Sequence, residues 1–334
     1  MTLTSIGDLA QNFALRGRNT DLKQTLMRLG NEVSSGRVTD PVNRLDGHFA
    51  YLSQIEHDLV MAASFGTGAK EVQISASAMQ NALGRISEES DSLVGTLVLA
   101  TTAAGTTEIS VVAGDARGAL DAIVSALNTN VAGRNVFSGV SVTENPIASA
   151  DDLLSGLQAV MAAALTPADA LAAAEAFFDP GGGFETGIYQ GSADSLAPVQ
   201  LGAGESANLD LRADHQAFRD TLRHVAVAAL ADDPGLALND TGRQALFGDV
   251  LDGLLSAKED QVSMQADLGF AEERIERANS RIEAEIASLR LARNDLLEVD
   301  PYEAATELEA VQLQLETLYA VTARLSRLSL VNYL

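Results

Sequence analysis

The chain has 334 residues and a formal net charge of −24, with 46% hydrophobic but only 4% aromatic residues and no tryptophan. So acidic a chain lacks the clustered Lys and Arg that bind nucleic acid or an anionic membrane surface. The shortage of large aromatic residues disfavours a compact enzyme core and favours aliphatic seams between helices.

Cysteine is absent, so the chain can form no disulfide, thiolate nucleophile or sulfur-ligated metal site. The N-terminal sequence MTLTSIGDLAQNFALRGRN has no basic stretch followed by an apolar one, and we therefore expect no Sec-type signal peptide. No run approaches the roughly 20 apolar residues that span a bilayer. We expect a soluble chain that uses another route if it leaves the cell.

A leucine stripe near the N-terminus predicts a helix, because its spacings of four, three and four place the side chains on one face. Its members are Leu22, Leu26, Leu29 and Val33. The segments 34–37 and 39–41 should end this helix through a glycine and through a proline that disfavours a helical Asp40.

A cleaner seven-residue repeat follows and predicts a long helix with a coiled-coil seam. The repeat consists of Val72, Met79, Ile86 and Leu93, with Ala76, Leu83, Ser90 and Leu97 interleaved. Residues 103–114 interrupt the pattern, and a further helix is expected to resume at Ala116.

The middle of the chain is rich in Gly, Pro and Ser, and we interpret residues 139–233 as an inserted mixed domain. Residues 198–201 and 207–211 are predicted strands. Within the Ala-rich stretch 151–178, the residues Thr166, Pro167 and Asp169 fit the cap, first turn and third position of a helix.

Helices dominate again in the C-terminal part. Ile275, Ile282, Leu289 and Leu296 lie seven apart. Asp300 is then a plausible cap for a last helix, with Pro301 in the first turn and Glu303 completing a capping box. The final apolar stripe consists of Leu308, Val311, Leu315, Leu318, Leu325 and Leu328 and is followed by Leu330, Val331, Tyr333 and Leu334.

Two stripes at opposite ends of a chain would pair into only a thin two-helix arm, which is too small to be stable alone. We therefore expect the stripes to dock onto other subunits. The predicted assembly residues are Leu22, Leu26, Leu29, Val33, Leu308, Val311, Leu315, Leu318, Leu325, Leu328, Leu330, Tyr333 and Leu334.

No pattern indicates catalysis. The histidines (His48, His57, His215 and His224) form no paired metal-ligand motif, and the acid pairs 151–152 and 232–233 have the surroundings of helix caps and loop charges. The glycines of residues 180–187 lack the Lys-Ser/Thr of a phosphate loop. We predict no catalytic site, no metal site and no cofactor.

Several segments resemble the flagellin family, and among its members the hook–filament junction proteins, also called L-type hook-associated proteins. NEVSSGRVTDPVNRLDG is similar to the segment after their first helix, and LYAVTARLSRLSLVNYL resembles their C-terminal helix. Two internal stretches, NTNVAGRNVFSGVSVTENP and IYQGSADSLAPVQLGAGESANLDLRADHQAF, are similar to their insert borders. The motif residues are Ser35, Gly36, Arg37, Asp40, Pro41, Gly133, Arg134, Phe137, Gly139, Tyr189 and Gly191.

The resemblance implies a non-enzymatic structural adaptor of the bacterial flagellum, exported unfolded through the type III apparatus and extracellular once assembled. Its terminal helices would be disordered in the monomer. Its implied partners are the K-type hook-associated protein, flagellin, a flagellar export chaperone, and further copies of itself in a ring. Two alternatives stay open: a divergent flagellin, and a cytoplasmic module whose ends form a coiled coil with an unrelated partner.

The expected fold is mainly α, with a long antiparallel helical bundle or coiled coil formed by the N- and C-terminal segments and an inserted β-containing domain. We divide it into three parts. Residues 1–44 and 299–334 would be the terminal helices, residues 45–138 and 234–298 a helical bundle, and residues 139–233 the inserted mixed α/β outer domain.

Overall fold

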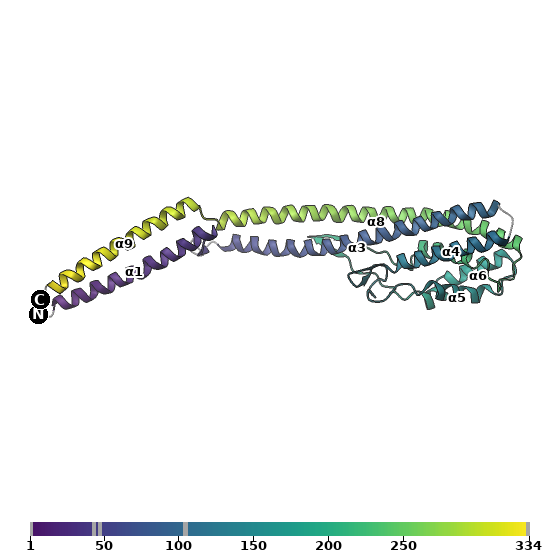
Figure 1. The fold of residues 1–334 in the computed structure, drawn as a ribbon, viewed down its shortest axis with the longest axis horizontal. Helices are drawn as coiled ribbons and strands as arrows, with labels where there is room; N and C mark the ends of the chain where they lie inside the picture. The colour runs from purple at the N-terminus through teal and green to yellow at the C-terminus, as the bar shows by residue number, and fades with distance from the viewer. Residues whose placement is uncertain (1–2, 42–44, 46–48, 103–105, 332–334) are drawn as a thin grey trace. The chain divides into compact units, whose positions relative to one another are not determined.

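The computed structural model describes residues 3–41, 45, 49–102 and 106–331, which form long helices and two short β-hairpins (Figure 1). The elements are α1 (Leu3–Ser35), α3 (Phe49–Thr102), α4 (Thr106–Leu127), β1 (Asn130–Val131), β2 (Arg134–Asn135), α5 (Ala150–Met161), α6 (Pro167–Phe178), the π-helical turn η1 (Phe184–Ile188), β3 (Val199–Gly202), β4 (Glu205–Ala207), α7 (Gln216–Ala229), α8 (Asp240–Leu297) and α9 (Pro301–Val331). The predicted mainly α fold with an inserted β-containing part is confirmed.

The chain divides into two compact units. Residues 1–62 and 284–334 form one, here called the terminal unit, and residues 63–283 form the other, here called the central unit. The three-part division expected from the sequence remains a prediction.

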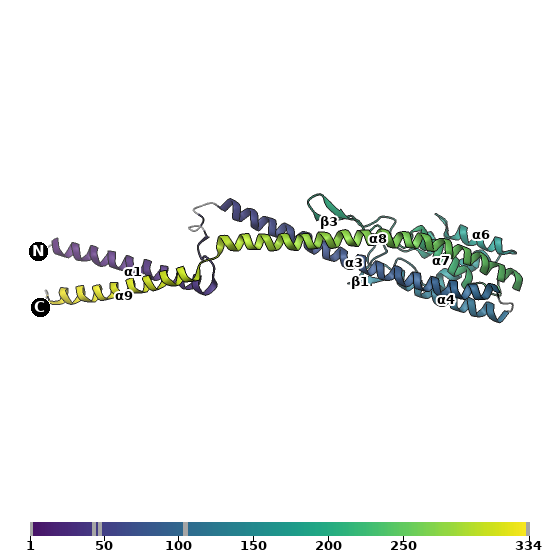
Figure 2. The ribbon, with the colours of Figure 1, turned by 90° about the horizontal axis from the view of Figure 1, so that it is seen from above.

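In the terminal unit, α1 and α9 lie side by side and antiparallel, as both ribbon views show (Figures 1 and 2). We call these two helices the terminal helix pair. The same unit includes the first residues of α3 and the last residues of α8, where Arg293 lies 3.6 Å from the carboxylate of Glu56.

In the central unit, side-chain bonds tie α3 to α8. Lys258 pairs with Asp91 at 2.5 Å, and Asn279 donates to Gln73 at 2.7 Å. Rising numbers on α8 meet falling numbers on α3, so the helices are antiparallel. Every member of the predicted repeat from Val72 to Leu97 is buried, Ser90 included. The predicted seam on α3 is therefore confirmed.

On α8 the predicted repeat is only partly buried. Ile275 and Ile282 are buried in the central unit, whereas Leu289 and Leu296, which belong to the terminal unit, are half-buried. The same seven-residue spacing therefore gives complete burial in one unit and incomplete burial in the other.

Helix α4 begins at Thr106, ten residues before the helix start expected from the sequence. The β-branched and glycine residues of 106–114 favour a break, but Ile109, Val112 and Ala113 are buried. The prediction of a break over all of residues 103–114 was therefore wrong, because burial of this apolar face overrides weak local propensity. Residues 103–105 lie outside the described part of the chain.

The inserted segment contains short elements that pack on helices rather than an extended sheet. Strand β1 pairs antiparallel with β2, and β3 with β4. The predicted strand at 198–201 agrees with β3. Of the strand predicted at 207–211, only Ala207 lies in β4, so the prediction was wrong for residues 208–211. Ala207 already pairs with Val199, and the next residue of that partner strand is Pro198, which has no N–H to donate.

Two predicted helix starts are confirmed. Thr166 and Asp169 form a reciprocal capping box at α6, with Pro167 in the first turn. At α9, the Asp300 carboxylate accepts from the backbone N–H of Tyr302 at 2.8 Å and from that of Glu303 at 3.3 Å. Both caps satisfy N–H groups that lack a partner within the helix.

Candidate assembly surface

The predicted assembly residues lie along the terminal helix pair, but their burial differs. Leu22 and Leu29 are buried between the two helices. Leu26, Leu308, Val311, Leu315, Leu318 and Leu325 are half-buried, and Val33 is exposed. The side chains of Leu328 and Leu330, together with Tyr333 and Leu334, lie outside what the structure describes. The stripe on α9 therefore keeps part of its apolar surface available to a further partner.

Large apolar side chains are also exposed on faces of α1 and α9 outside the predicted apolar stripes. Phe13 on α1 is 81% exposed, and Leu313 on α9 is 66% exposed. Met27, Tyr319 and Val321 are exposed as well. A single exposed apolar residue is common on protein surfaces. Several along two paired helices are typical of an interaction surface. Reading each helix for apolar residues outside its main stripe would have found them.

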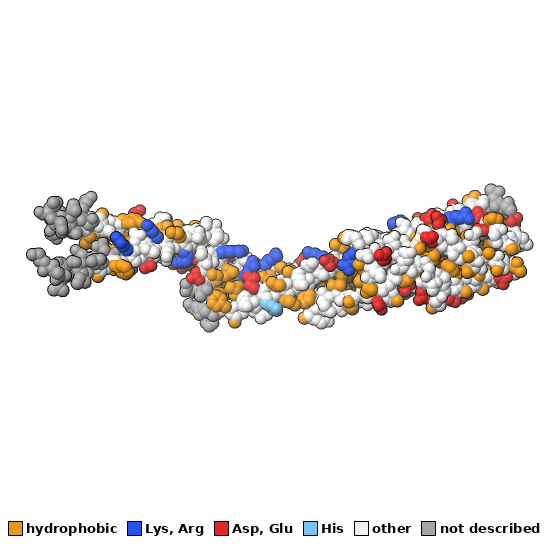
Figure 3. Space-filling view, turned by 90° about the horizontal axis from the view of Figure 1, so that it is seen from below, with side chains coloured by type: hydrophobic (Ala, Val, Ile, Leu, Met, Phe, Trp, Pro, Cys, Tyr) orange, Lys and Arg blue, Asp and Glu red, His pale blue; other side chains and the backbone are white. Residues whose placement is uncertain are grey.

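Hydrophobic and charged side chains alternate along the described parts of these helices, and Figure 3 shows orange, blue and red atoms on one face. The terminal helix pair therefore has apolar side chains on its outer surface, among the charged ones, in addition to the apolar side chains between its two helices. A packed core helix would bury one such stripe and leave a largely polar exterior.

A short backbone ribbon joins the end of α1 to the segment between α8 and α9. The N–H of Val38 donates to the carbonyl of Leu297 at 2.9 Å, and the N–H of Val299 donates to the carbonyl of Gly36 at 3.2 Å. Gly36 has φ +67°, a left-handed conformation that glycine adopts without a steric penalty. The motif residues Ser35, Gly36 and Arg37 thus form the turn that holds the two segments together.

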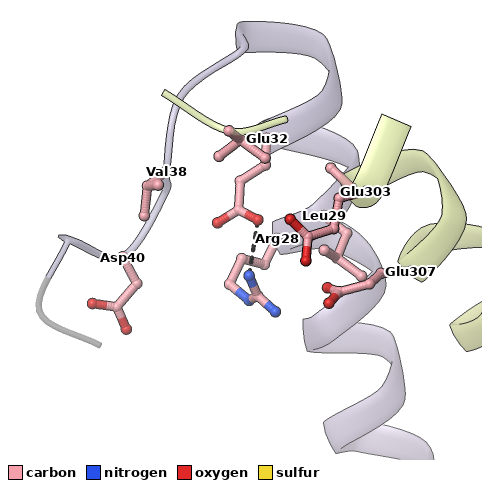
Figure 4. Close-up of a pocket in the computed structure, with 9 residues that line it drawn as sticks. Arg28, Leu29, Glu32, Val38, Asp40, Glu303 and Glu307 are labelled. Atoms are coloured by element: carbon pink, nitrogen blue, oxygen red, sulfur yellow. Dashed lines mark hydrogen bonds and ion pairs between the residues drawn. The ribbon is translucent and has the colours of Figure 1, made fainter. Parts of the chain in front are cut away.

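A buried carboxylate organises this ribbon. Glu32 is 4% exposed, accepts from the guanidinium of Arg28 at 2.8 Å, and accepts from the backbone N–H of Thr39 at 3.0 Å. It lines a cavity of about 290 Å³ together with Asp40, Glu303 and Glu307 (Figure 4). Because both Glu32 oxygens are engaged, this carboxylate fixes the path of residues 36–40.

The insert-border motif builds a tight local core. Gly133 has φ +83° in the turn between β1 and β2, next to Arg134. Phe137 is fully buried and meets the ring of Phe218 edge-on, with centroids 5.8 Å apart. Gly139 has φ +62°, and a Cβ there would overlap the carbonyl oxygen of Asp194. Local packing therefore explains Phe137 and Gly139, and the left-handed backbone conformation explains Gly133.

Tyr189 and Gly191 fit one another in the same region. The Tyr189 hydroxyl donates to the carbonyl of Ser192 at 2.8 Å, and a Cβ at Gly191 would collide with the tyrosine ring. Burial, followed by the negative charge of Asp214, raises the pKa of Tyr189 to about 12. The tyrosine is therefore a neutral hydrogen-bond donor at physiological pH.

The histidines do not converge. His215 caps α7, His57 is exposed on α3, and His224 is buried against the backbone of Gly253. His48 lies outside the described residues. Burial, then the charge of Arg223, lowers the pKa of His224 to about 4. Across the ranges that the structure describes, no group of three or more His, Asp or Glu side chains is placed to hold a metal ion.

None of the helices within the described ranges is long and apolar enough to cross a membrane. The main features of the structure are the terminal helix pair, the backbone ribbon at one end of it, and an insert whose helices α5, α6 and α7 pack on one another, with α7 also packed on α4.

Comparison with known proteins gives two findings and one absence. Residues 251–334, which include most of α8 and all of α9, match the family model described as the bacterial flagellin C-terminal helical region. The crystal structure of FlgL from Bacillus cereus is similar to this chain with a TM-score of 0.53 at 14% identity, covering 72% of this chain and 98% of FlgL. A search of curated protein sequences finds no match.

A second solved structure, of a putative flagellar hook-associated protein from Vibrio parahaemolyticus, aligns with a TM-score of 0.49 at 12% identity, covering 73% of this chain and 95% of the other. The resemblance of the C-terminal segment that the sequence motifs indicated is thus confirmed: residues 251–334 match the bacterial flagellin C-terminal helical region, in a chain whose fold is similar to that of FlgL.

Proposed function

We propose that this chain is a structural, non-enzymatic subunit of the bacterial flagellum that joins the hook-associated ring to the flagellin filament. The observation that carries the proposal is the flagellin-type C-terminal region, because it includes α9 and therefore the half-buried apolar stripe. The likeness to FlgL favours a junction subunit over a filament subunit.

The proposed partners follow from this role. The K-type hook-associated protein would lie on one side and flagellin on the other, with further copies of this chain completing a ring. A flagellar export chaperone would bind the C-terminal stripe before assembly, since an exposed apolar helix needs a cover. The protein would act outside the cell after export through the flagellar type III apparatus.

Electron microscopy of hook tips tests the proposal. A strain lacking this chain should assemble hooks without filaments, and the wild-type chain supplied in trans should restore filaments. Normal filaments in the deletion strain, confirmed by immunoblot to lack the protein, would contradict the junction role.

The main alternative is a divergent flagellin, and copy number separates the two. An adaptor should be present in sheared flagella at about one ring per filament, whereas a flagellin would be the most abundant protein in the sample. Quantitative immunoblotting against the major filament protein gives the ratio. A protein found only in the cell interior would support a cytoplasmic coiled-coil module instead.

We also propose that the terminal helix pair is loose in the free monomer. Its interior is thin, since only Leu22, Leu29 and Ala304 of the described apolar side chains on α1 and α9 are buried. Limited proteolysis should remove roughly 40 N-terminal and 30 C-terminal residues and leave a resistant core. Termini that resist the same protease dose would contradict the idea.

A further inference from the structure

Arg134 is the insert-border motif residue whose role local packing leaves open. Its backbone pairs with Val131 in the β1–β2 hairpin, and its side chain is exposed. Within the described chain its guanidinium forms no ion pair and no hydrogen bond. Arg134 lines a cavity of about 100 Å³ that lies wholly in the central unit. An unpaired guanidinium at the edge of a cavity is free to bind a ligand.

The interior of this cavity is apolar. Four buried side chains form its floor: Val72 and Met79 of α3, Val136 after β2, and Ala207 of β4. The half-buried Leu196, Val199 and Leu209 continue its walls. Water in such a space makes few hydrogen bonds, so an apolar group displaces it at little cost.

Two contacts hold the β3–β4 hairpin over this floor. Val199 of β3 packs so closely on α3 that a Cβ added to Gly68 would lie 3.2 Å from its Cγ1 atom. On the other strand, the Glu205 carboxylate pairs with Arg281 of α8. The hairpin is therefore fixed to two long helices, and the cavity is formed before any ligand binds, as is usual for small-molecule sites.

One acidic side chain shares the cavity with Arg134. Glu71 of α3 lines it, is exposed, and has no ion-pair partner among the described residues. Glu71 and Arg134 do not pair with one another, although they are the only charged residues among the described ones that line the cavity. Because both side chains are exposed, they lie at its opening. The opening therefore offers one positive and one negative group above an apolar interior.

We propose that this cavity binds a free aliphatic α-amino acid, such as valine or leucine. The side chain enters the apolar interior, the carboxylate accepts hydrogen bonds from the fork of the Arg134 guanidinium, and the ammonium group lies beside the Glu71 carboxylate. An apolar cavity of about 150 Å³ binds benzene. A cavity of about 100 Å³ therefore suits a small branched side chain.

A zwitterion is the ligand that uses both charges at the opening. A carboxylate without an ammonium group would meet the negative charge of Glu71, and an amine without a carboxylate would meet the positive charge of Arg134. A neutral apolar molecule would use neither charge. The inference goes beyond the proposed function and does not depend on it, because it rests on the central unit alone.

Ligand-observed NMR on the purified full-length protein tests the proposal, with leucine as the probe. Saturation of the protein should transfer to the leucine methyl groups, and a titration gives the dissociation constant. Isocaproate and isoamylamine each lack one charged group and should bind more weakly, and N-acetyl-leucinamide, which lacks both, should bind most weakly. No transfer to leucine at millimolar concentration, or equal binding of leucine and N-acetyl-leucinamide, would overturn the proposal.

Substitutions at the opening test the two charged contacts. R134Q and E71Q should each raise the dissociation constant for leucine about fivefold or more, since each removes one charge from the site. R85Q and E88Q neutralise exposed residues of α3 that do not line the cavity, and should leave leucine binding unchanged. Wild-type affinity in R134Q or in E71Q would contradict recognition of a zwitterion.

Substitutions inside the cavity test where the leucine side chain lies. A207L fills part of the interior while keeping both charges, and should abolish the saturation transfer. Overpacking destabilises some cores, so the melting temperature of this variant is measured first. A197L places a larger side chain at an exposed lining residue, where the risk to folding is small, and should weaken leucine binding as well. Wild-type affinity in A197L, or in a folded A207L, would show that leucine does not enter this cavity.

Discussion

The central unit and the terminal unit use the same aliphatic spacing with different results. On α3, residues of the repeat such as Ile86 and Leu97 are fully buried, because α3 packs in a bundle that includes α8 and the insert. On α9, Leu308 and Leu315 are only half-buried, since α1 is the helix that packs along α9. Periodicity therefore specifies which face is apolar, and the number of neighbouring elements determines how much of that face is covered.

This difference in burial between α3 and α9 indicates which apolar residues stabilise the monomer and which would serve association with another subunit. A side chain covered within the monomer contributes to the free energy of unfolding, whereas one covered by another subunit contributes to association. The following substitutions compare matched positions, the first three pairs between the two units and the last pair within the central unit, beginning with the largest expected effect.

Two aliphatic positions, one in each unit, test most directly whether burial serves stability or assembly. Ile86→Asp places a charge at a fully buried site and should lower the free energy of unfolding by about 4 kcal/mol or more, and the melting temperature by roughly 10 °C or more. Leu315→Asp, at a half-buried site of the terminal helix pair, should leave the main thermal transition nearly unchanged and block filament growth. Circular dichroism and a swimming assay measure both. Equal loss of melting temperature in the two variants would mean that α9 is ordinary core.

Two phenylalanines offer a milder version of the same test. Phe137→Ala removes a fully buried ring and should cost about 3–5 kcal/mol of unfolding free energy. Phe13→Ala removes a ring that is 81% exposed and should change that free energy by less than about 0.5 kcal/mol. Denaturant unfolding gives both values. A large loss for Phe13→Ala would show that α1 folds against a surface inside the monomer.

Acid should weaken the central unit through His224. Its folded-state pKa of about 4 lies below the usual value near 6.5, so between these pH values the unfolded chain binds a proton that the folded chain does not. The free energy of unfolding should therefore fall as the pH drops through this window, by about 3 kcal/mol at most. His224→Gln should flatten this dependence, while His57→Gln, at an exposed site, should retain it. An unchanged pH profile in His224→Gln would assign the effect to other groups.

The smallest expected changes in unfolding free energy come from two glycines. They distinguish the cost of a left-handed backbone conformation from the cost of steric overlap. Gly139→Ala forces a side chain into a left-handed residue and against the carbonyl of Asp194, and should cost about 2 kcal/mol or more. Gly133→Ala meets the same backbone penalty with no atom within 4 Å, and should cost about 1 kcal/mol. Similar values for both variants would mean that the loop at Gly139 relaxes freely.

Much of the fold followed from local patterns. Seven-residue spacing predicted the buried seam of α3, and Thr166 and Asp300 predicted two helix starts, because periodicity and caps act over a few residues. The start of α4 could not be predicted, since it depends on burial of Ile109 and Val112 against distant elements. The end of β4 depends on where Pro198 falls in the partner strand, which is a matter of register.

The candidate surface was less predictable than the fold. The leucine stripes indicated an interaction, but a stripe alone does not show whether Leu29 faces its own α9 or another subunit. Glu32 was overlooked for a related reason. Its role depends on Arg28 and Thr39, and only the folded turn brings the backbone of Thr39 to its carboxylate.

The ribbon between residues 36–38 and 297–299 also affects the order of folding. It joins segments about 260 residues apart, so it closes a loop that contains the whole central unit. Closing so long a flexible loop carries a large entropic cost, which falls once the intervening chain has become compact. We therefore expect the central unit to fold first and to bring the two ends within reach. On this account α1 and α9 pair only after the central unit has folded, although α1 precedes that unit in the chain and is synthesised before it.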